Sequence, residues 1–105
     1  MKRASLTERA IVVNPADNVA TALADLEAGE RMELSVQDKP FFVILSGSVP
    51  YGHKFSLTTI VAGAAVIKYG ETIGIATSLI RTGDYVHVHN LASARARGDL
   101  MGGGE

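Results

Sequence analysis

The stretch Lys68–Leu91, KYGETIGIATSLIRTGDYVHVHNL, decides the fold and carries the clearest candidate chemistry. Its segment Tyr85–Asn90 is β-like, with alternating residue types. Successive side chains of a strand face opposite sides. An extended conformation therefore predicts that His87 and His89 share one face with Tyr85. Neighbours on one strand face lie roughly 6.5 to 7 Å apart, a separation from which two imidazoles can reach one metal ion or opposite ends of one polar ligand.

The third histidine, His53, lies in Gly52-His53-Lys54 at the end of a loop-like segment, Ser46–Gly52. That segment is rich in turn-forming residues and is the most flexible-looking internal loop. We predict that the loop delivers His53 and Lys54 to the same polar end of a small β domain as the other two histidines.

An internal repeat extends the strand interpretation over much of the chain. The pattern apolar-x-x-Gly-x-x-apolar occurs at Leu26–Met32, Ile60–Val66 and Ile80–Val86. Each glycine can adopt a positive φ at little cost, which suits a tight turn that leads into a strand. Helical spacing favours a helix over Val19–Leu26 by propensity alone. Because the third copy runs into Tyr85–Asn90, we predict strand, turn, strand three times, with a helical turn before some glycines.

The remaining segments fit the same interpretation. Arg31–Val36 alternates apolar and polar residues, as a half-buried strand does. Further strands are expected at Ala10–Val13 and Phe41–Leu45, a turn at Asp38–Pro40, and a hairpin in which Ala65–Tyr69 and Glu71–Ile75 flank Gly70.

Composition bounds the class of protein. The chain has 105 residues, 47% hydrophobic and 20% charged, as expected for one globular domain. The net charge is −1 and the sequence has no basic stripe that could contact phosphates, so we do not expect nucleic-acid binding. The sequence has no cysteine, no signal peptide and no apolar run long enough to span a bilayer, so we expect a cytoplasmic protein. We place one domain at residues 1–91 and a mobile or docking tail at 92–105.

The residues alone leave the candidate chemistry open. His87-Val88-His89 is compatible with a metal site, a general acid and base pair, or a polar exposed face. A metal site closed within the chain is disfavoured, because no carboxylate stands near these histidines at a familiar ligand spacing. Gly52-His53-Lys54 is compatible with a carboxylate-binding loop or a solvated one. Lys68 is compatible with a catalytic role or a hairpin position, and we favour the hairpin.

Four blocks together resemble the N-terminal region of altronate dehydratases. They are Asp17–Leu26, Gly52–Leu57, Val66–Gly74 and Gly83–Asn90, in this order. The resemblance covers the chain from about Ile11 to Leu91. The same region is called an SAF domain, and relatives of it occur in galactarate dehydratase and as the small subunit of sulfolactate sulfo-lyase. It implies an all-β, β-clip fold of short strands and long twisted hairpins, with at most one or two short helical turns.

The resemblance also implies a function. Altronate dehydratase has a much larger C-terminal region, so the chain resembles the small half of a two-component lyase that dehydrates a sugar acid and is inactive without its large subunit. The expected catalytic residues are His53, His87 and His89. The expected substrate-binding residues are Lys54, Lys68 and Asn90. Fe²⁺ or Mn²⁺ is expected in the assembled enzyme, held mostly by the large subunit, and a homo-oligomer is expected in isolation. The alternatives are a sulfolactate-type lyase subunit and a non-catalytic β-clip binding module.

Overall fold

A computed structural model describes residues 9–12, 14–36 and 39–93. These residues form nine strands and no helix, which confirms the all-β prediction. The strands are β1 (Ala10–Ile11), β2 (Val19–Ala22), β3 (Arg31–Val36), β4 (Lys39–Ile44), β5 (Lys54–Ser56), β6 (Ala65–Lys68), β7 (Glu71–Ala76), β8 (Tyr85–Val86) and β9 (Leu91–Ser93). The described residues contain no helix that is long and apolar enough to cross a membrane.

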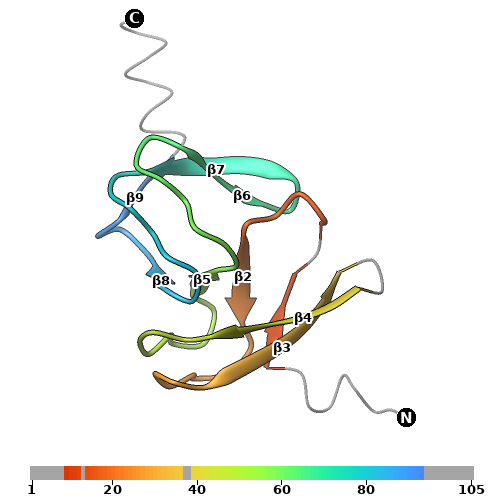
Figure 1. The fold of residues 1–105 in the computed structure, drawn as a ribbon. Helices are drawn as coiled ribbons and strands as arrows, with labels where there is room; N and C mark the ends of the chain where they lie inside the picture. Colours follow the sequence, from red (N-terminus) through yellow and green to blue (C-terminus); the bar gives the residue numbers. More distant parts are fainter. Residues whose placement is uncertain (1–8, 13, 37–38, 94–105) are drawn as a thin grey trace, which may run out of the picture.

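The strands form three antiparallel sheets. One has the order β1-β2-β5-β8, one is the β3-β4 hairpin, and one has the order β6-β7-β9. Figure 1 shows the β3-β4 hairpin at one end of the domain and β6 and β7 at the other, with β2 running between them. The central sheet therefore connects the two ends.

The glycine repeat is a structural module, and it occurs four times rather than three. The fourth copy is Val49–Phe55, and its first four residues lie in the segment Ser46–Gly52 that was predicted to be a flexible loop. In each copy the first apolar residue forms a β-bridge, Leu26 with Val49 and Ile60 with Ile80. A bend precedes each bridge and a turn that contains the glycine follows it. No described residue is helical, so the helical turns predicted before some glycines are wrong. The module glycines all have a positive φ: Gly29 84°, Gly52 83°, Gly63 90° and Gly83 90°.

The module explains why the pattern has apolar residues at both ends. All eight of these residues are buried, namely Leu26, Met32, Val49, Phe55, Ile60, Val66, Ile80 and Val86. They contribute to two separate hydrophobic clusters. The first lies against the β3-β4 hairpin and includes Phe55, and the second includes Ile60, Val66, Ile80 and Val86.

The β6-β7 hairpin forms as predicted, around the two-residue turn Tyr69-Gly70. Both turn residues have a positive φ, 58° and 77°, which is the geometry that matches the twist of a tight hairpin. Asp17 Oδ1 accepts a hydrogen bond from the Gly70 backbone N–H at 2.8 Å. Asn18 donates to Ala65 O at 3.0 Å and accepts from Ile67 N–H at 2.7 Å, where β6 pairs with the bulged part of β7. The Asp17-Asn18 pair of the first resemblance block therefore attaches this hairpin to β2.

Several predicted boundaries differ from the structure. β4 begins at Lys39, so Lys39 and Pro40 belong to a strand rather than to the predicted turn, because they pair with Val36 and Ser35. β9 continues through Ser93, two residues beyond the predicted domain boundary at Leu91, because it pairs with β7. The rest of the predicted tail lies outside the described residues.

Candidate functional site

The segment His87–Asn90 is a turn, so the predicted strand ends at Val86. Asn90 N–H donates to His87 O at 3.0 Å, and the Asn90 side chain accepts from His87 N–H at 2.9 Å and donates to Tyr85 O at 2.9 Å. Asparagine favours such turns because its amide replaces backbone partners that a strand would supply. Asn90 is buried, and its amide therefore fixes the chain on which both histidines stand.

The turn still brings the predicted histidines together. We call the group formed by the side chains of His53, Tyr85, His87 and His89 the imidazole cluster. The His53 and His87 rings have centroids 4.7 Å apart. Tyr85 stacks on His87 with an interplanar angle of 9° at 5.5 Å, and its centroid lies 5.6 Å from that of His89.

Strand register explains why His53 reaches this cluster. The turn Pro50–His53 is closed by a hydrogen bond from His53 N–H to Pro50 O, 3.0 Å long, and it leads directly into β5. On β5, Phe55 is paired with Tyr85 of β8. Because alternate residues of a strand share a face, His53 is directed to the same side as Tyr85. The Nδ1 atom of His53 lies 2.8 Å from the Tyr85 hydroxyl oxygen.

Tyr85 is a site residue that sequence reasoning missed. The sequence placed it on one face with His87 and His89, but it assigned no role to the phenol. Its hydroxyl contacts His53 and its ring contacts all three histidines, so it is the central member of the imidazole cluster.

Lys54 faces away from the imidazole cluster. It is paired with Val86, whose side chain is buried in the second hydrophobic cluster, so it projects from the face of β5 opposite to His53. Burial lowers the pKa of the Lys54 ammonium, and the positive charge of Lys68 lowers that pKa further. The Lys68 ammonium itself lies 4.8 Å from the centroid of the Tyr69 ring. Lys54 and Lys68 therefore form a basic pair that is separate from the imidazole cluster.

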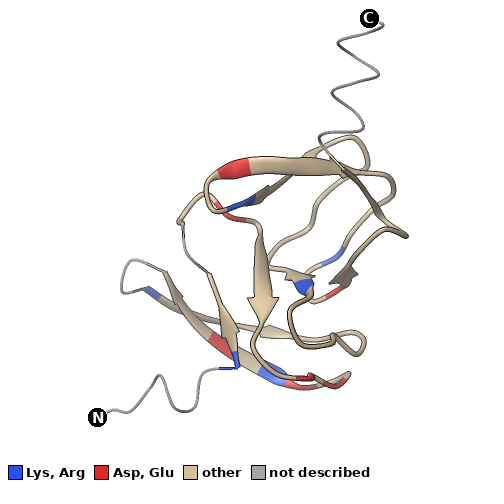
Figure 2. Cartoon of the chain, turned by 180° about the vertical axis from the view of Figure 1, so that it is seen from behind, with Lys and Arg blue, Asp and Glu red and all other residues tan. Residues whose placement is uncertain are grey.

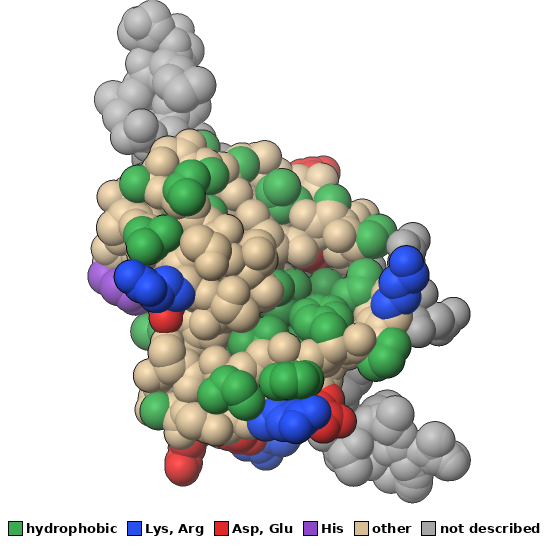
Figure 3. Space-filling view, in the orientation of Figure 1, with side chains coloured by type: hydrophobic (Ala, Val, Ile, Leu, Met, Phe, Trp, Pro, Cys, Tyr) green, Lys and Arg blue, Asp and Glu red, His purple; other side chains and the backbone are tan. Residues whose placement is uncertain are grey.

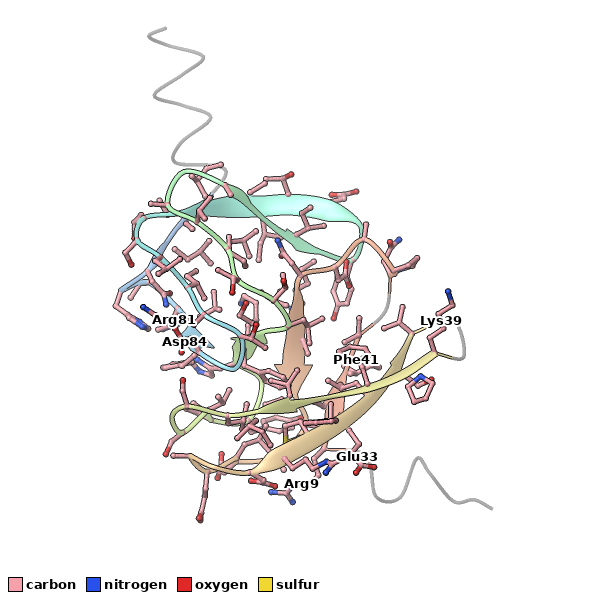
Figure 4. The ribbon with its side chains drawn as sticks, viewed as in Figure 1. Arg9, Glu33, Lys39, Phe41, Arg81 and Asp84 are labelled. Atoms are coloured by element: carbon pink, nitrogen blue, oxygen red, sulfur yellow. The ribbon has the colours of Figure 1, made fainter. Side chains whose placement is uncertain are left out.

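Asp84 secures the entry to β8. Its Oδ2 atom accepts from Arg81 N–H at 2.8 Å, and its Oδ1 atom accepts from the Ser46 hydroxyl at 2.5 Å. Figure 4 shows the Arg81 and Asp84 side chains close to β8. These contacts join the module turn before Tyr85 to the end of β4.

Charged residues of both signs occur along the described part of the chain, as Figure 2 shows. In Figure 3, apolar side chains gather in a hollow above the β3-β4 hairpin, whereas histidine atoms reach the surface at the opposite edge of the view. The imidazole cluster is thus at the surface and apart from this hollow.

The donor set of the described residues does not form a metal site by itself. No group of three or more His, Asp, Glu or Cys side chains in this part of the chain is arranged to hold a metal ion. In addition, His53 Nδ1 already has a hydrogen-bond partner in Tyr85. Without a metal ion, these side chains can donate and accept hydrogen bonds and can act as acid or base groups.

Comparison with known proteins identifies the family. The profile described as "Altronate/galactarate dehydratase SAF domain" matches residues 8–94. The chain is 50% identical over 80 residues to altronate dehydratase from Escherichia coli (strain K12), which is 76% of this chain and 15% of that protein. It is 37% identical over 78 residues to galactarate dehydratase (L-threo-forming) from the same organism, or 72% and 14% of the two proteins.

A relative of similar size extends this comparison. The chain is 33% identical over 88 residues to (2R)-sulfolactate sulfo-lyase subunit alpha from Chromohalobacter salexigens, which is 80% of this chain and 94% of that subunit. The chain therefore spans about a seventh of the length of the dehydratases that it matches and nearly all of a separate lyase subunit. It belongs to the altronate/galactarate dehydratase SAF domain family, whose named members here are lyases.

Proposed function

We propose that this chain is the small subunit of a two-component hydro-lyase that dehydrates a sugar acid such as altronate or galactarate to a 2-keto-3-deoxy acid. The imidazole cluster is the observation that carries the proposal. It gathers three imidazoles, which can act as acid, base or hydrogen-bond partner, within ring-contact distance of one tyrosine. The cluster is built from two resemblance blocks, Gly52–Leu57 and Gly83–Asn90.

The histidines of the imidazole cluster are suited to the two proton transfers of this reaction. A base removes the proton next to the substrate carboxylate, the enediolate must be stabilised, and an acid protonates the departing hydroxyl. His53, His87 and His89 are the proposed acid and base groups. Asn90 holds the two turn histidines, and its predicted contact with substrate stays a prediction.

The basic pair formed by Lys54 and Lys68 can accept an anionic group. Lys54 and Lys68 repel each other electrostatically, and in the described residues neither ammonium has a carboxylate within salt-bridge distance. Bringing an anionic group to the pair relieves that repulsion. The pair lies on the face of β5 opposite to His53, so it is not placed to hold the carboxylate whose neighbouring proton a cluster histidine removes, and the predicted substrate contacts of Lys54 and Lys68 stay predictions.

The surface beside the cluster supports a larger partner. Val88, between the two turn histidines, is 80% exposed, and Tyr51, two residues before His53, is 67% exposed. Exposed apolar groups that flank a candidate site are typical of surfaces that a second chain covers. We propose that a large dehydratase subunit docks here in the cytoplasm and holds most ligands of an Fe²⁺ or Mn²⁺ ion, which stabilises the enediolate when bound.

A second candidate is a sulfolactate-type lyase subunit, in which sulfite rather than water departs. It is favoured by the match to 94% of the sulfo-lyase alpha subunit. A non-catalytic binding module is the remaining alternative, and it predicts no turnover with any partner.

The test is anaerobic purification of the chain together with the large lyase chain made by the same cells, followed by assays with altronate, galactarate and (2R)-sulfolactate. We expect turnover of a sugar acid only when both chains are present. His87→Gln and His89→Gln should each lower kcat by about 100-fold or more, since acid and base groups contribute about 10²- to 10⁴-fold. Lys39→Gln, an exposed position on β4, is the matched control. Full activity in both histidine variants would exclude the proposed roles.

A further inference from the structure

Tyr85 and His53 form a hydrogen-bonded pair within the imidazole cluster. The Tyr85 hydroxyl oxygen lies 2.8 Å from His53 Nδ1, and the ring centroids are 5.7 Å apart with a tilt of 51°. The contact joins side chains 32 positions apart in the sequence. It exists because β5 and β8 are neighbours, with Phe55 paired with Tyr85.

The position of the Tyr85 ring is fixed from several sides. Its backbone pairs with Phe55, and its carbonyl accepts from the buried Asn90 amide at 2.9 Å. The ring packs against the first hydrophobic cluster and stacks almost parallel on His87. A side chain held in this way brings its hydroxyl to His53 with little loss of conformational entropy.

The chemistry of the two groups indicates which one donates. A neutral imidazole has one N–H donor and one acceptor nitrogen, and a phenol carries one O–H. Among the described residues, His53 Nδ1 is the hydrogen-bond partner that the structure gives to the Tyr85 hydroxyl. If Nδ1 carried the proton, the phenol proton would have no acceptor in this part of the protein. Donation from Tyr85 to Nδ1 satisfies both groups.

We propose that Tyr85 is a positioning residue that holds neutral His53 as the Nε2–H tautomer. In that form Nε2 has no free lone pair, so His53 serves as a hydrogen-bond donor to an oxygen of the bound acid and not as the base. The base role then belongs to His87 or His89. This division of roles rests on the proposed lyase function, whereas the tautomer itself does not.

Nitrogen-15 NMR of the full chain tests the tautomer directly. Two-bond proton-nitrogen correlations of the histidine rings are recorded at a pH about two units above the ordinary imidazole pKa of about 6.5. His53→Gln assigns the His53 signals. In the wild-type chain we expect His53 in one tautomer, with the proton on Nε2 and a hydrogen-bonded Nδ1. In Tyr85→Phe we expect the Nδ1 signal to shift toward that of a free ring nitrogen and the single tautomer to be lost.

Tyr51→Phe is the matched control, because this exposed tyrosine lies close to His53 in sequence, and it should leave the His53 signals unchanged. A wild-type His53 with its proton on Nδ1 would overturn the proposal, as would identical spectra for the wild-type chain and Tyr85→Phe. If Tyr85→Phe does not fold, the position of the His53 proton in the wild-type chain still tests the proposal.

Kinetics of the assembled enzyme separate the two proposals. With altronate, Tyr85→Phe should lower kcat by about 10-fold with little change in KM, as expected for loss of an orienting partner. Activity that survives His53→Gln refutes the role of His53 in the lyase but leaves the tautomer result intact. An Nδ1–H tautomer refutes the positioning role even if every histidine proves essential.

Discussion

Asn90 occupies the point at which the chain turns away from β8, and its buried amide links His87 to the carbonyl of Tyr85. An amide suits this position because its oxygen must accept a hydrogen bond from His87 N–H and its nitrogen must donate one to Tyr85 O. Alanine provides neither function, and it leaves two buried backbone groups without partners.

We therefore expect Asn90→Ala to lower the free energy of unfolding by about 2 kcal/mol or more, since each buried group left unpaired costs about 1 to 3 kcal/mol. Asn90→Asp keeps the shape and the acceptor but loses the donor to Tyr85 O at neutral pH. Its loss of stability should shrink as acid protonates the new carboxyl, which can then donate. Urea unfolding at neutral and acidic pH measures both effects. Equal losses in Asn90→Asp at the two pH values would contradict this reading of the turn.

Lys54 allows a prediction of pH dependence. Burial and Lys68 hold its folded-state pKa below the ordinary value of 10.5, so the unfolded chain binds more protons between these two pKa values. Stability from this group therefore rises as the pH increases through that window. At neutral pH both states are charged, and the unfavourable burial of the ammonium is fully present.

Lys54→Met should accordingly stabilise the chain at pH 7, and the gain should diminish as the pH approaches 10.5, the ordinary lysine value. Urea unfolding curves over this range provide the measurement. Lys39→Met, at an exposed position on β4, is the control and should show little dependence. A Lys54→Met effect that is constant across the range would count against a depressed pKa.

At the scale of single residues, the sequence identified the three histidines but not their arrangement. His87 and His89 were expected to meet through strand alternation, and they meet around Tyr85 through a turn instead. The contact between Tyr85 and His53 depends on the β5-β8 pairing, which local patterns do not specify. The same register places His53 and Lys54 on opposite faces.

Among the elements, the glycine module was the most predictable part of the fold. Its spacing encodes a turn with a positive φ between two buried apolar residues, and three copies were found from that pattern alone. The fourth, Val49–Phe55, was hidden because Pro50 and the preceding serines and glycine suggest a loop. Its membership is clear only from the Leu26-Val49 bridge, a contact between distant segments.

The copies of the module are not equally tolerant of change. Gly63 and Gly83 both have a φ of 90°, but a Cβ on Gly63 would meet no atom within 4 Å, whereas a Cβ on Gly83 would lie 2.1 Å from Ile44 O. Gly63→Ala should cost about 1 kcal/mol, the strain of an L-residue at positive φ. Gly83→Ala should cost about 3 kcal/mol or more, because the backbone of β4 must also move.

Denaturant unfolding of the two variants tests this difference. Since Gly83 leads into β8, Gly83→Ala should also disturb the Tyr85 and His87 signals, and Gly63→Ala should not. Similar losses of stability in the two variants would show that positive φ, and not the close approach to Ile44, determines the cost at Gly83.

For the molecule as a whole, the decisive feature is that two hydrophobic clusters share the same strands. β2 contributes Ala20 and Ala22 to the first cluster and Val19 to the second. On β8, Tyr85 packs on the first cluster and Val86 belongs to the second. Because β2 and β8 belong to both clusters, unfolding of these strands exposes both clusters to water. The two clusters should therefore unfold together.

Matched substitutions test this coupling. Val43 in the first cluster is 2% exposed and Val66 in the second is 0% exposed, so Val→Ala removes the same two methyl groups from equally buried sites. Each variant should lose about 2 kcal/mol of stability with an unchanged denaturant slope. Circular dichroism and the NMR signals of residues in both clusters should report one midpoint per variant. Separate midpoints, with the signals of only the substituted cluster shifted, would mean that β2 and β8 do not couple the two ends. The imidazole cluster, which depends on β5 and β8 together, would then lose its geometry before the rest of the domain unfolds.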